Sequence, residues 1–159
     1  MATRRGVLKL VGGGCVLAAV GAGGFVAANG PSRSARAPWR EAGQEMEFRR
    51  RALSYAILAP NPHNRQPWLV RLDGDDALTL YCDLDRRLPA TDPYDRQIVI
   101  GHGAFLELLA LAAAEDGYGT EVTLFPDGED MATLDARPVA SVRFVPGGAE
   151  PDPLFAHVL

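Results

Sequence analysis

The sequence is poor in cysteine and, beyond its first nine residues, contains no lysine. Of its two cysteines, Cys15 lies in an apolar N-terminal stretch, so Cys82 alone remains in the body of the chain and no internal disulfide can form there. Cys82, His63, His102 and His157 show none of the short paired spacings of zinc sites. We therefore expect no metal site, and stability must come from the hydrophobic core.

Positive charge is also scarce in the body of the chain. After residue 28, 13 arginines stand against 20 aspartates and glutamates, which gives a formal charge of −7. A surface this acidic repels nucleic acid and anionic lipid. The whole sequence of 159 residues is 47% hydrophobic and 23% charged, which is typical of a chain with one globular domain.

The N-terminal stretch differs from that body. Arg4 and Arg5 precede a run without charge from Leu10 to Ala28 that is rich in glycine and alanine. The segment Thr3–Lys9 resembles a twin-arginine export signal.

This resemblance divides the chain into a signal segment at 1–28, a polar linker at 29–38 and a folded part at 39–159. It implies export across the bacterial cytoplasmic membrane to the periplasm or cell envelope. An uncleaved signal, about long enough to span the membrane, would instead anchor the protein there.

Apolar spacing predicts the first elements of the folded part. A helical pattern runs from Trp39 to Leu58 and must end before Pro60, because a residue that precedes proline is pushed out of helical geometry. Apolar and polar residues then alternate on both sides of a glycine-containing turn, which predicts a β-hairpin at 67–84.

A long helix is predicted at 95–116, with Asp95 as its N-cap. Apolar residues surround this helix, so we expect it to be buried on all sides, with Gly101 and Gly103 allowing another backbone to approach. Strands follow at 120–125 and 138–145, and Asp152 begins a short helical segment at the end of the chain.

The loop between the first helix and the hairpin, residues 59–68, reads APNPHNRQPW. A plain connector needs only one or two turn residues. A carboxamide offers a donor and an acceptor from one side chain, and flanking prolines reduce the entropy cost of holding it in place. The loop is therefore predicted to hold a polar ligand.

Six residues of this loop resemble the Pro-Ser-x-x-Asn-x-Gln-Pro-Trp motif of the nitroreductase superfamily of flavoproteins; they are Pro60, Asn61, Asn64, Gln66, Pro67 and Trp68. The order of helix, loop, hairpin, long helix and strand between about residues 40 and 125 follows that family as well. The sequence looks most like a branch in which two nitroreductase-like halves are fused, and it resembles the N-terminal half.

The resemblance implies an α+β fold, a nitroreductase-like mixed sheet flanked by helices and incomplete at the C-terminus. It also implies a flavin mononucleotide (FMN) cofactor, bound by Asn61, Pro62, Asn64 and Gln66, although serines are usual at the first two positions. The expected reaction is hydride transfer through the flavin, from a nicotinamide cofactor to a small organic acceptor. No residue is assigned as a catalytic acid or base.

The sequence has no comparable motif for binding the cofactor phosphate. Family members usually carry an arginine-rich segment before the first helix, whereas Arg33, Arg36 and Arg40 are spread through the linker and Arg49–Arg51 lie within the predicted helix. A second nitroreductase-like half, or a homodimer partner, is therefore expected to complete the site.

Two other functions stay open. A flavin-sequestering protein, or a remnant without catalysis, would carry the same loop. Residues 97–127 also resemble an FAD- or NAD-binding Rossmann-type βαβ unit with Gly101 and Gly103 at the turn, although Leu106 stands where a third glycine belongs. A strand ending at Gly101 would favour the Rossmann interpretation.

Overall fold

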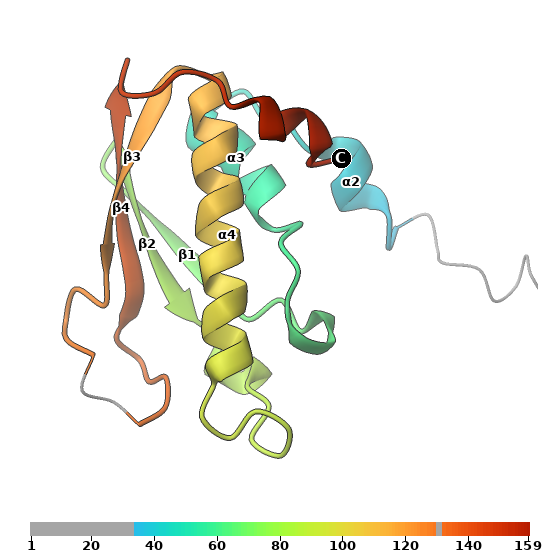
Figure 1. The fold of residues 1–159 in the computed structure, drawn as a ribbon, viewed down its shortest axis with the longest axis vertical. Helices are drawn as coiled ribbons and strands as arrows, with labels where there is room; N and C mark the ends of the chain where they lie inside the picture. Colours follow the sequence, from blue (N-terminus) through green and yellow to red (C-terminus); the bar gives the residue numbers. More distant parts are fainter. Residues whose placement is uncertain (1–33, 130–131) are drawn as a thin grey trace, which may run out of the picture. The chain divides into compact units, whose positions relative to one another are not determined.

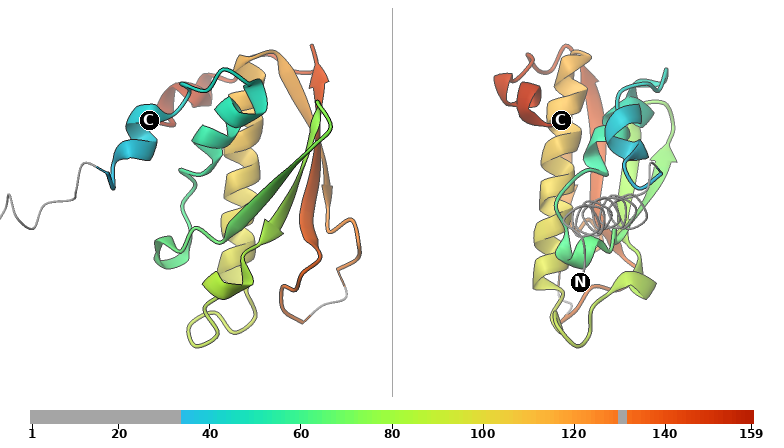
Figure 2. Two further views of the ribbon diagram at one scale, coloured as in Figure 1. Left: turned by 180° about the vertical axis from the view of Figure 1, so that it is seen from behind. Right: turned by 90° about the vertical axis from the view of Figure 1, so that its right-hand side faces the viewer.

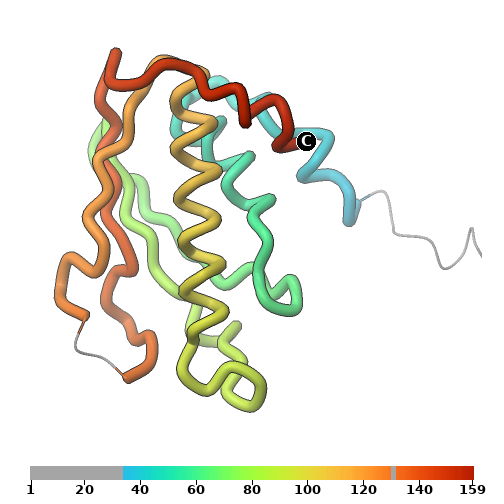
Figure 3. The backbone as a smooth tube through the Cα atoms, viewed as in Figure 1, coloured from blue at the N-terminus to red at the C-terminus, as the bar shows by residue number. Residues whose placement is uncertain are grey.

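The computed structural model describes residues 34–129 and 132–159. The expected signal segment and residues 29–33 of the linker lie outside this range. Residues Pro38–Leu159 form a compact unit (Figures 1 and 3). The elements in chain order are α2 (Ala37–Glu41), α3 (Phe48–Ala56), η1 (Pro62–Asn64), β1 (Trp68–Asp73), β2 (Ala77–Cys82), η2 (Leu84–Arg86), α4 (Arg96–Glu115), β3 (Tyr118–Leu124), β4 (Pro138–Pro146) and η3 (Pro153–His157).

The strands form one sheet in the order β1-β2-β4-β3. Together with the helices it makes an α+β fold, which confirms the expected class. One detail differs, because every neighbouring pair of the described strands is antiparallel, whereas a mixed sheet was expected. β2 and β3 do run in the same direction, as a crossover through α4 allows, but β4 lies between them and pairs with both.

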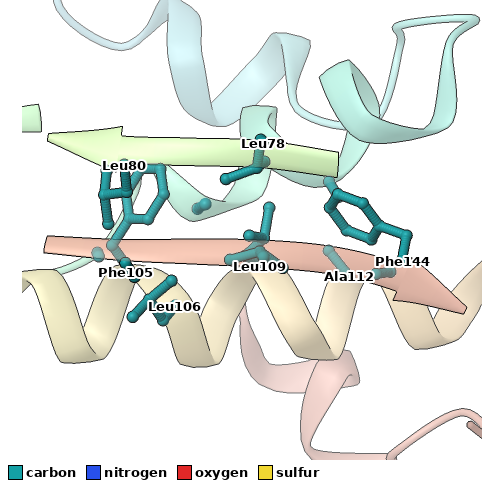
Figure 4. Close-up of a cluster of buried hydrophobic side chains, with 13 residues drawn as sticks. Leu78, Leu80, Phe105, Leu106, Leu109, Ala112 and Phe144 are labelled. Atoms are coloured by element: carbon teal, nitrogen blue, oxygen red, sulfur yellow. The ribbon is translucent and has the colours of Figure 1, made fainter. Parts of the chain in front are cut away.

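Helices α3 and α4 cover the same face of the sheet (Figures 1 and 2). Side chains of both helices interlock there with those of the two inner strands, and burying them supplies most of the driving force for folding (Figure 4). The buried members include Ala52, Ala56, Leu78, Leu80, Phe105, Leu109, Val142 and Phe144.

The helix predicted from Trp39 to Leu58 is broken into α2 and α3. Gly43 lies in the break with a left-handed φ of 81°, and its N–H donates to Ser54 Oγ at 2.8 Å. Glu47 then starts α3 as an N-cap, accepting the N–H groups of Arg49 and Arg50. A second cap and a left-handed glycine outweigh the apolar spacing that suggested one continuous helix.

The long helix is present as α4, within one residue of its predicted bounds. Its N-cap works differently from the prediction, because Asp92 Oδ2, and not Asp95, accepts the N–H groups of Gln97 and Ile98 at 2.9 and 3.1 Å. The same helix contains residues 97–103 throughout, so no strand ends at Gly101. The Rossmann interpretation of residues 97–127 is therefore wrong.

The expectation that α4 is buried on all sides is also wrong. The side facing the sheet and α3 is buried, but Ile100 on the outward side is 71% exposed, and Gly103 and Glu107 are exposed beside it. By length and composition α4 could also span a membrane, with half of its most apolar window buried in the fold. Its apolar outward side thus has no covering layer among the described residues.

The hairpin of β1 and β2 is confirmed, with Asp73 opposite Ala77 at its turn. Arg49 of α3 holds this turn, donating from Nη1 to the carbonyls of Gly74 and Ala77 at 2.9 and 3.1 Å. The later strands are confirmed as β3 and β4. The expected terminal helix is a 3-10 segment, η3, whose first N–H group is accepted by Asp152.

Candidate functional site

The loop that joins α3 to β1 is closed by the side chain of Asn61. Its Nδ2 donates to the carbonyl oxygen of Ala59 at 3.0 Å, and its Oδ1 accepts the backbone N–H of Gln66 at 2.7 Å. One carboxamide therefore bonds to both arms of the loop.

Three residues of the loop adopt left-handed backbone conformations. The φ angles are 51° for His63, 49° for Asn64 and 54° for Gln66. Such a conformation costs about 1–2 kcal/mol relative to a right-handed one. Pro67 further restricts the backbone conformations that are open to Gln66. The side chains add one bond, from Gln66 Nε2 to Asn64 Oδ1 at 3.0 Å. Strain of this kind persists only where surrounding contacts hold it, and it is common at ligand sites.

Hydrogen bonds between two arginines connect the loop to η2. Arg65 donates from Nε to the carbonyl of Arg86 at 3.2 Å, and Arg86 donates from Nη1 to the carbonyl of Arg65 at 3.0 Å. Arg86 also forms an ion pair with Asp83 at 3.0 Å. These reciprocal bonds connect the exposed loop to the end of the hairpin.

A hollow of about 320 Å³ lies between the loop and α4. We call it the α4 hollow; its lining residues are Pro60, Asn61, Pro62, Gln97, Ile100, Gly101 and Ala104. Loop and helix approach closely, since a Cβ placed on Gly101 would lie 3.4 Å from Asn61 Cβ. Gly101 thus has the close-approach role expected from the sequence, whereas nothing lies within 4 Å of a Cβ on Gly103.

The four residues predicted to bind the cofactor divide into two groups. Asn61 and Pro62 line the α4 hollow, while Asn64 and Gln66 do not. The helix side of the hollow includes Gln97 and Ile100, which sequence reasoning placed within a buried helix. The missed signal was the combination of an amide and a large apolar residue on the side of α4 that faces away from the sheet.

Amide atoms of the loop and of the helix side of the hollow keep unused hydrogen-bonding capacity. Within the described ranges, Asn64 Nδ2, Gln66 Oε1 and the carboxamide of Gln97 make no hydrogen bond. The first is a donor, the second an acceptor, and the third offers both. This set suits a ligand that presents donors and acceptors along a flat edge.

No cation lines the α4 hollow. Two of the three consecutive arginines of α3 are engaged elsewhere, Arg49 at the hairpin turn and Arg51 with Asp116 at 2.7 Å. The hollow therefore fits the uncharged part of a ligand and provides no clamp for a phosphate.

His102 lies in the core behind the loop and is 1% exposed. Its Nδ1 bonds to the carbonyl of Ile98 at 2.9 Å, whereas Nε2 is buried and has no hydrogen-bond partner among the described residues. Burial lowers the pKa of His102 from its ordinary value of 6.5, and nearby backbone carbonyls oppose this only in part. Among the described residues the imidazole is therefore bonded through one ring nitrogen only.

Trp68 packs in the same region. It is partly buried against the core, with its ring centroid 5.1 Å from that of Phe105 and 6.3 Å from that of His102. It anchors β1 to α4 and so fixes the end of the loop. Among the residues that the structure describes, no three histidines, cysteines or acids gather where they could hold a metal ion.

Comparison with known proteins finds relatives that match part of the chain. No protein-family model matches the chain. A Mycobacterium tuberculosis protein provisionally named an NAD(P)H nitroreductase is 34% identical over 98 residues, which cover 60% of this chain and 28% of that protein. A second protein of that organism with the same provisional description is 37% identical over 90 residues, covering 55% of this chain and 27% of its own length. These matches support the assignment to the nitroreductase superfamily that the loop motif indicates.

Two solved structures of nitroreductase-family proteins align with this chain. One, from Clostridium difficile 630, gives a TM-score of 0.49 at 21% identity and covers 71% of this chain and 78% of its own. The other, from Streptococcus pneumoniae TIGR4, gives 0.45 at 18% identity and covers 68% and 81%. The match to the curated relatives spans little more than a quarter of their length, so the activity of a whole protein is a matter for proposal.

Proposed function

We propose that this chain supplies one wall of an FMN site in an NAD(P)H-dependent oxidoreductase that reduces a small organic acceptor. The observation that carries the proposal is the α4 hollow beside a strained, amide-rich loop whose residues match the nitroreductase motif. Nitroreductase-family proteins generally use flavin, and FMN is the form that the motif implies.

The residues fit part of the cofactor. Asn64 Nδ2 and Gln66 Oε1 offer a donor and an acceptor on the loop, and Gln97 offers a carboxamide on the helix side. These are the groups needed by a flavin ring edge and by ribityl hydroxyls. Bound flavin would supply the hydride chemistry, and the protein would supply binding, orientation and electrostatics. The loop's part is to hold its amides still.

The missing phosphate clamp has to come from another chain segment. The outward side of α4 exposes Ile100 and, next to it, Gly103, although an apolar surface of this kind is normally covered. A second nitroreductase-like half or a second copy of the chain would cover this side and bring cations to the hollow. The described residues thus form only part of the cofactor site.

Export is a separate part of the proposal. We infer from the resemblance of Thr3–Lys9 that a twin-arginine signal at 1–28 directs the protein to the periplasm or cell envelope. Replacing both Arg4 and Arg5 by lysine should leave the precursor in the cytoplasm, because recognition depends on guanidinium groups and not on charge alone. Fractionation of cells that express the two forms tests this, and unchanged export of the double variant would refute it.

The cofactor is tested on a completed form, in which this chain is combined with a second nitroreductase-like half or with a second copy of itself. Titration with FMN, followed by absorbance and fluorescence quenching, should show binding, and reduced nicotinamide should then bleach the bound flavin. Asn64→Ala should weaken binding by about 1–2 kcal/mol, which is the cost of a lost buried hydrogen bond, or about 5–30-fold in Kd.

Gln44→Ala serves as the matched control, since it removes an amide that bonds to the Arg40 carbonyl and lies outside the hollow. A completed form that stays colourless in excess FMN would refute the cofactor assignment. Flavin that binds but is not bleached by nicotinamide would instead indicate storage rather than catalysis.

A further inference from the structure

Both polar atoms of the Asn61 carboxamide bond within its own loop. Its Nδ2 points to the Ala59 carbonyl and its Oδ1 to the Gln66 N–H, while its Cα and Cβ face Gly101 of α4. A side chain that recognised a cofactor edge would need a donor or an acceptor free in that direction. Asn61 thus lines the α4 hollow with carbon and keeps its polar atoms for the backbone.

We propose that Asn61 is a positioning residue of the flavin site, which sets the conformation of Gln66 and Asn64 without touching the cofactor. The inference rests on the proposed function and deepens it. Three of the four predicted cofactor-binding residues then have separate roles, since Asn61 shapes the loop, and Asn64 and Gln66 meet the ligand.

The backbone bonds show how the positioning works. Asn64 N–H bonds to the Asn61 carbonyl at 3.1 Å, and Arg65 N–H bonds to the Pro62 carbonyl at 3.1 Å, which is the i→i−3 pattern of a 3-10 helix. The next bond of this series would join Gln66 N–H to the carbonyl of His63. The Asn61 side chain takes that N–H instead, so the series of i→i−3 bonds ends there, and Gln66 is left-handed as His63 and Asn64 are.

The left-handed turn at Gln66 decides where its side chain goes. Gln66 Nε2 reaches back to Asn64 Oδ1 at 3.0 Å, which leaves Asn64 Nδ2 and Gln66 Oε1 as the free donor and acceptor. Without the bond from Asn61, the unfavourable φ of Gln66 before a proline has no compensation. The pair of free amide atoms would then lose its fixed geometry.

The positioning role predicts different results for two substitutions. Asn61→Ala removes both bonds and should release the turn. Asn61→Asp keeps an acceptor for the Gln66 N–H, loses only the donor to Ala59, and should largely restore the turn. A direct cofactor contact through Nδ2 would make Asp as harmful as Ala.

The first test needs no flavin. The sequence has three glutamines, so selective ¹⁵N labelling gives one backbone amide each for Gln44, Gln66 and Gln97. In the unaltered 159-residue chain the Gln66 amide should exchange slowly with solvent. Asn61→Ala should accelerate its exchange at least about tenfold, in line with the loss of one hydrogen bond, and Asn61→Asp should return most of the protection.

The Gln97 amide is the internal reference, because Asp92 Oδ2 holds it at 2.9 Å at the start of α4. Its exchange should be the same in all three proteins. Rapid exchange of Gln66 in the unaltered chain would overturn the positioning role before any variant is made. Unchanged protection of Gln66 in Asn61→Ala would overturn it as well.

The second test is FMN affinity in the completed form, with the second half or second copy present. Asn61→Ala should raise the Kd about tenfold and Asn61→Asp only slightly, in the same order as the exchange rates. Equal loss of affinity in both variants, with Gln66 still protected, would show a direct contact and overturn the inference. Absence of FMN binding in every form would refute the proposed function and leave the exchange result standing.

Discussion

Arg87 and Asp95 form a two-point ion pair at the start of α4. Arg87 Nε lies 2.9 Å from Asp95 Oδ1 and Nη2 lies 2.8 Å from Oδ2. The Asp95 side chain is 1% exposed, whereas that of Arg87 is 26% exposed. Asp95 Oδ2 also accepts the Leu134 N–H at 2.8 Å, so one carboxylate joins the loops before α4 and before β4.

This asymmetry of exposure predicts unequal costs for removing the two partners. Arg87→Ala leaves a buried carboxylate without its cation and should lower the free energy of unfolding by about 3–5 kcal/mol. Asp95→Asn should cost less, about 1–3 kcal/mol, because Arg87 can turn to water and asparagine tolerates the left-handed φ of 55°. Urea unfolding of both variants measures the difference. The double variant should cost less than the two single costs combined, and simple additivity would show that the pair does not interact.

His102 predicts a dependence of stability on pH. Its folded pKa lies below its ordinary value of 6.5 because the ring is buried, so the unfolded chain takes up the proton more readily. The contribution of neutral His102 is full above about pH 6.5 and is lost as the pH falls through the folded-state pKa. The free energy of unfolding should therefore fall more steeply below pH 6.5 in the unaltered protein than in His102→Gln. His157, one of two exposed histidines, gives the control His157→Gln, which should retain the slope of the unaltered protein.

Cys82 is expected to be unreactive in the folded protein. It is 4% exposed, and burial, with a smaller effect from Asp95, raises the pKa of its thiol from 9.0 to about 11. In a Cys15→Ser background at pH 8, a disulfide reagent should label Cys82 at least about 100-fold faster in urea than in buffer, because the thiolate is the reacting form. Fast labelling of the folded chain would contradict the described packing of β2.

At Gly101, a methyl group and a larger side chain should have different effects on stability. A Cβ there would make an ordinary contact of 3.4 Å with Asn61, and alanine favours a helix by about 1 kcal/mol over glycine. Gly101→Ala should therefore leave stability unchanged or raise it by up to that amount. Gly101→Leu should push the loop away from α4 and lower stability, whereas Gly103→Leu, which meets open space, should not. In a Trp39→Phe background, Trp68 fluorescence should shift to the red only for Gly101→Leu.

Sequence patterns predicted the elements whose signals were local and strong. The hairpin follows from alternation around a glycine turn, and α4 follows from apolar residues bounded by Asp95 and Gly117. The break between α2 and α3 was harder to predict, because the left-handed turn at Gly43 depends on the distant Ser54 hydroxyl. The position of β4 between β2 and β3 is a long-range pairing, and no spacing in the sequence specifies it.

The site was predicted at the level of the loop and not of its atoms. The prolines and amides of residues 59–68 indicated a rigid polar segment, and the structure shows one. The set of free amides depends on bonds such as that from Gln66 N–H to Asn61 Oδ1. These bonds depend on left-handed conformations that the residue types do not predict. The helix side of the hollow was missed because the apolar pattern of α4 suggested burial all round.

The central place of β4 in the sheet has a consequence for how the chain folds during synthesis. Leu78 pairs with Val142 and Leu80 with Ala140, so β2 gains its second neighbour only after the ribosome has released the last of the four strands. Until then β2 and β3 each present an unpaired edge, which is a template for pairing with other chains. Contacts so distant in the sequence also form slowly. The nascent protein should therefore depend most on chaperones in the interval between completion of α4 and emergence of residue 146.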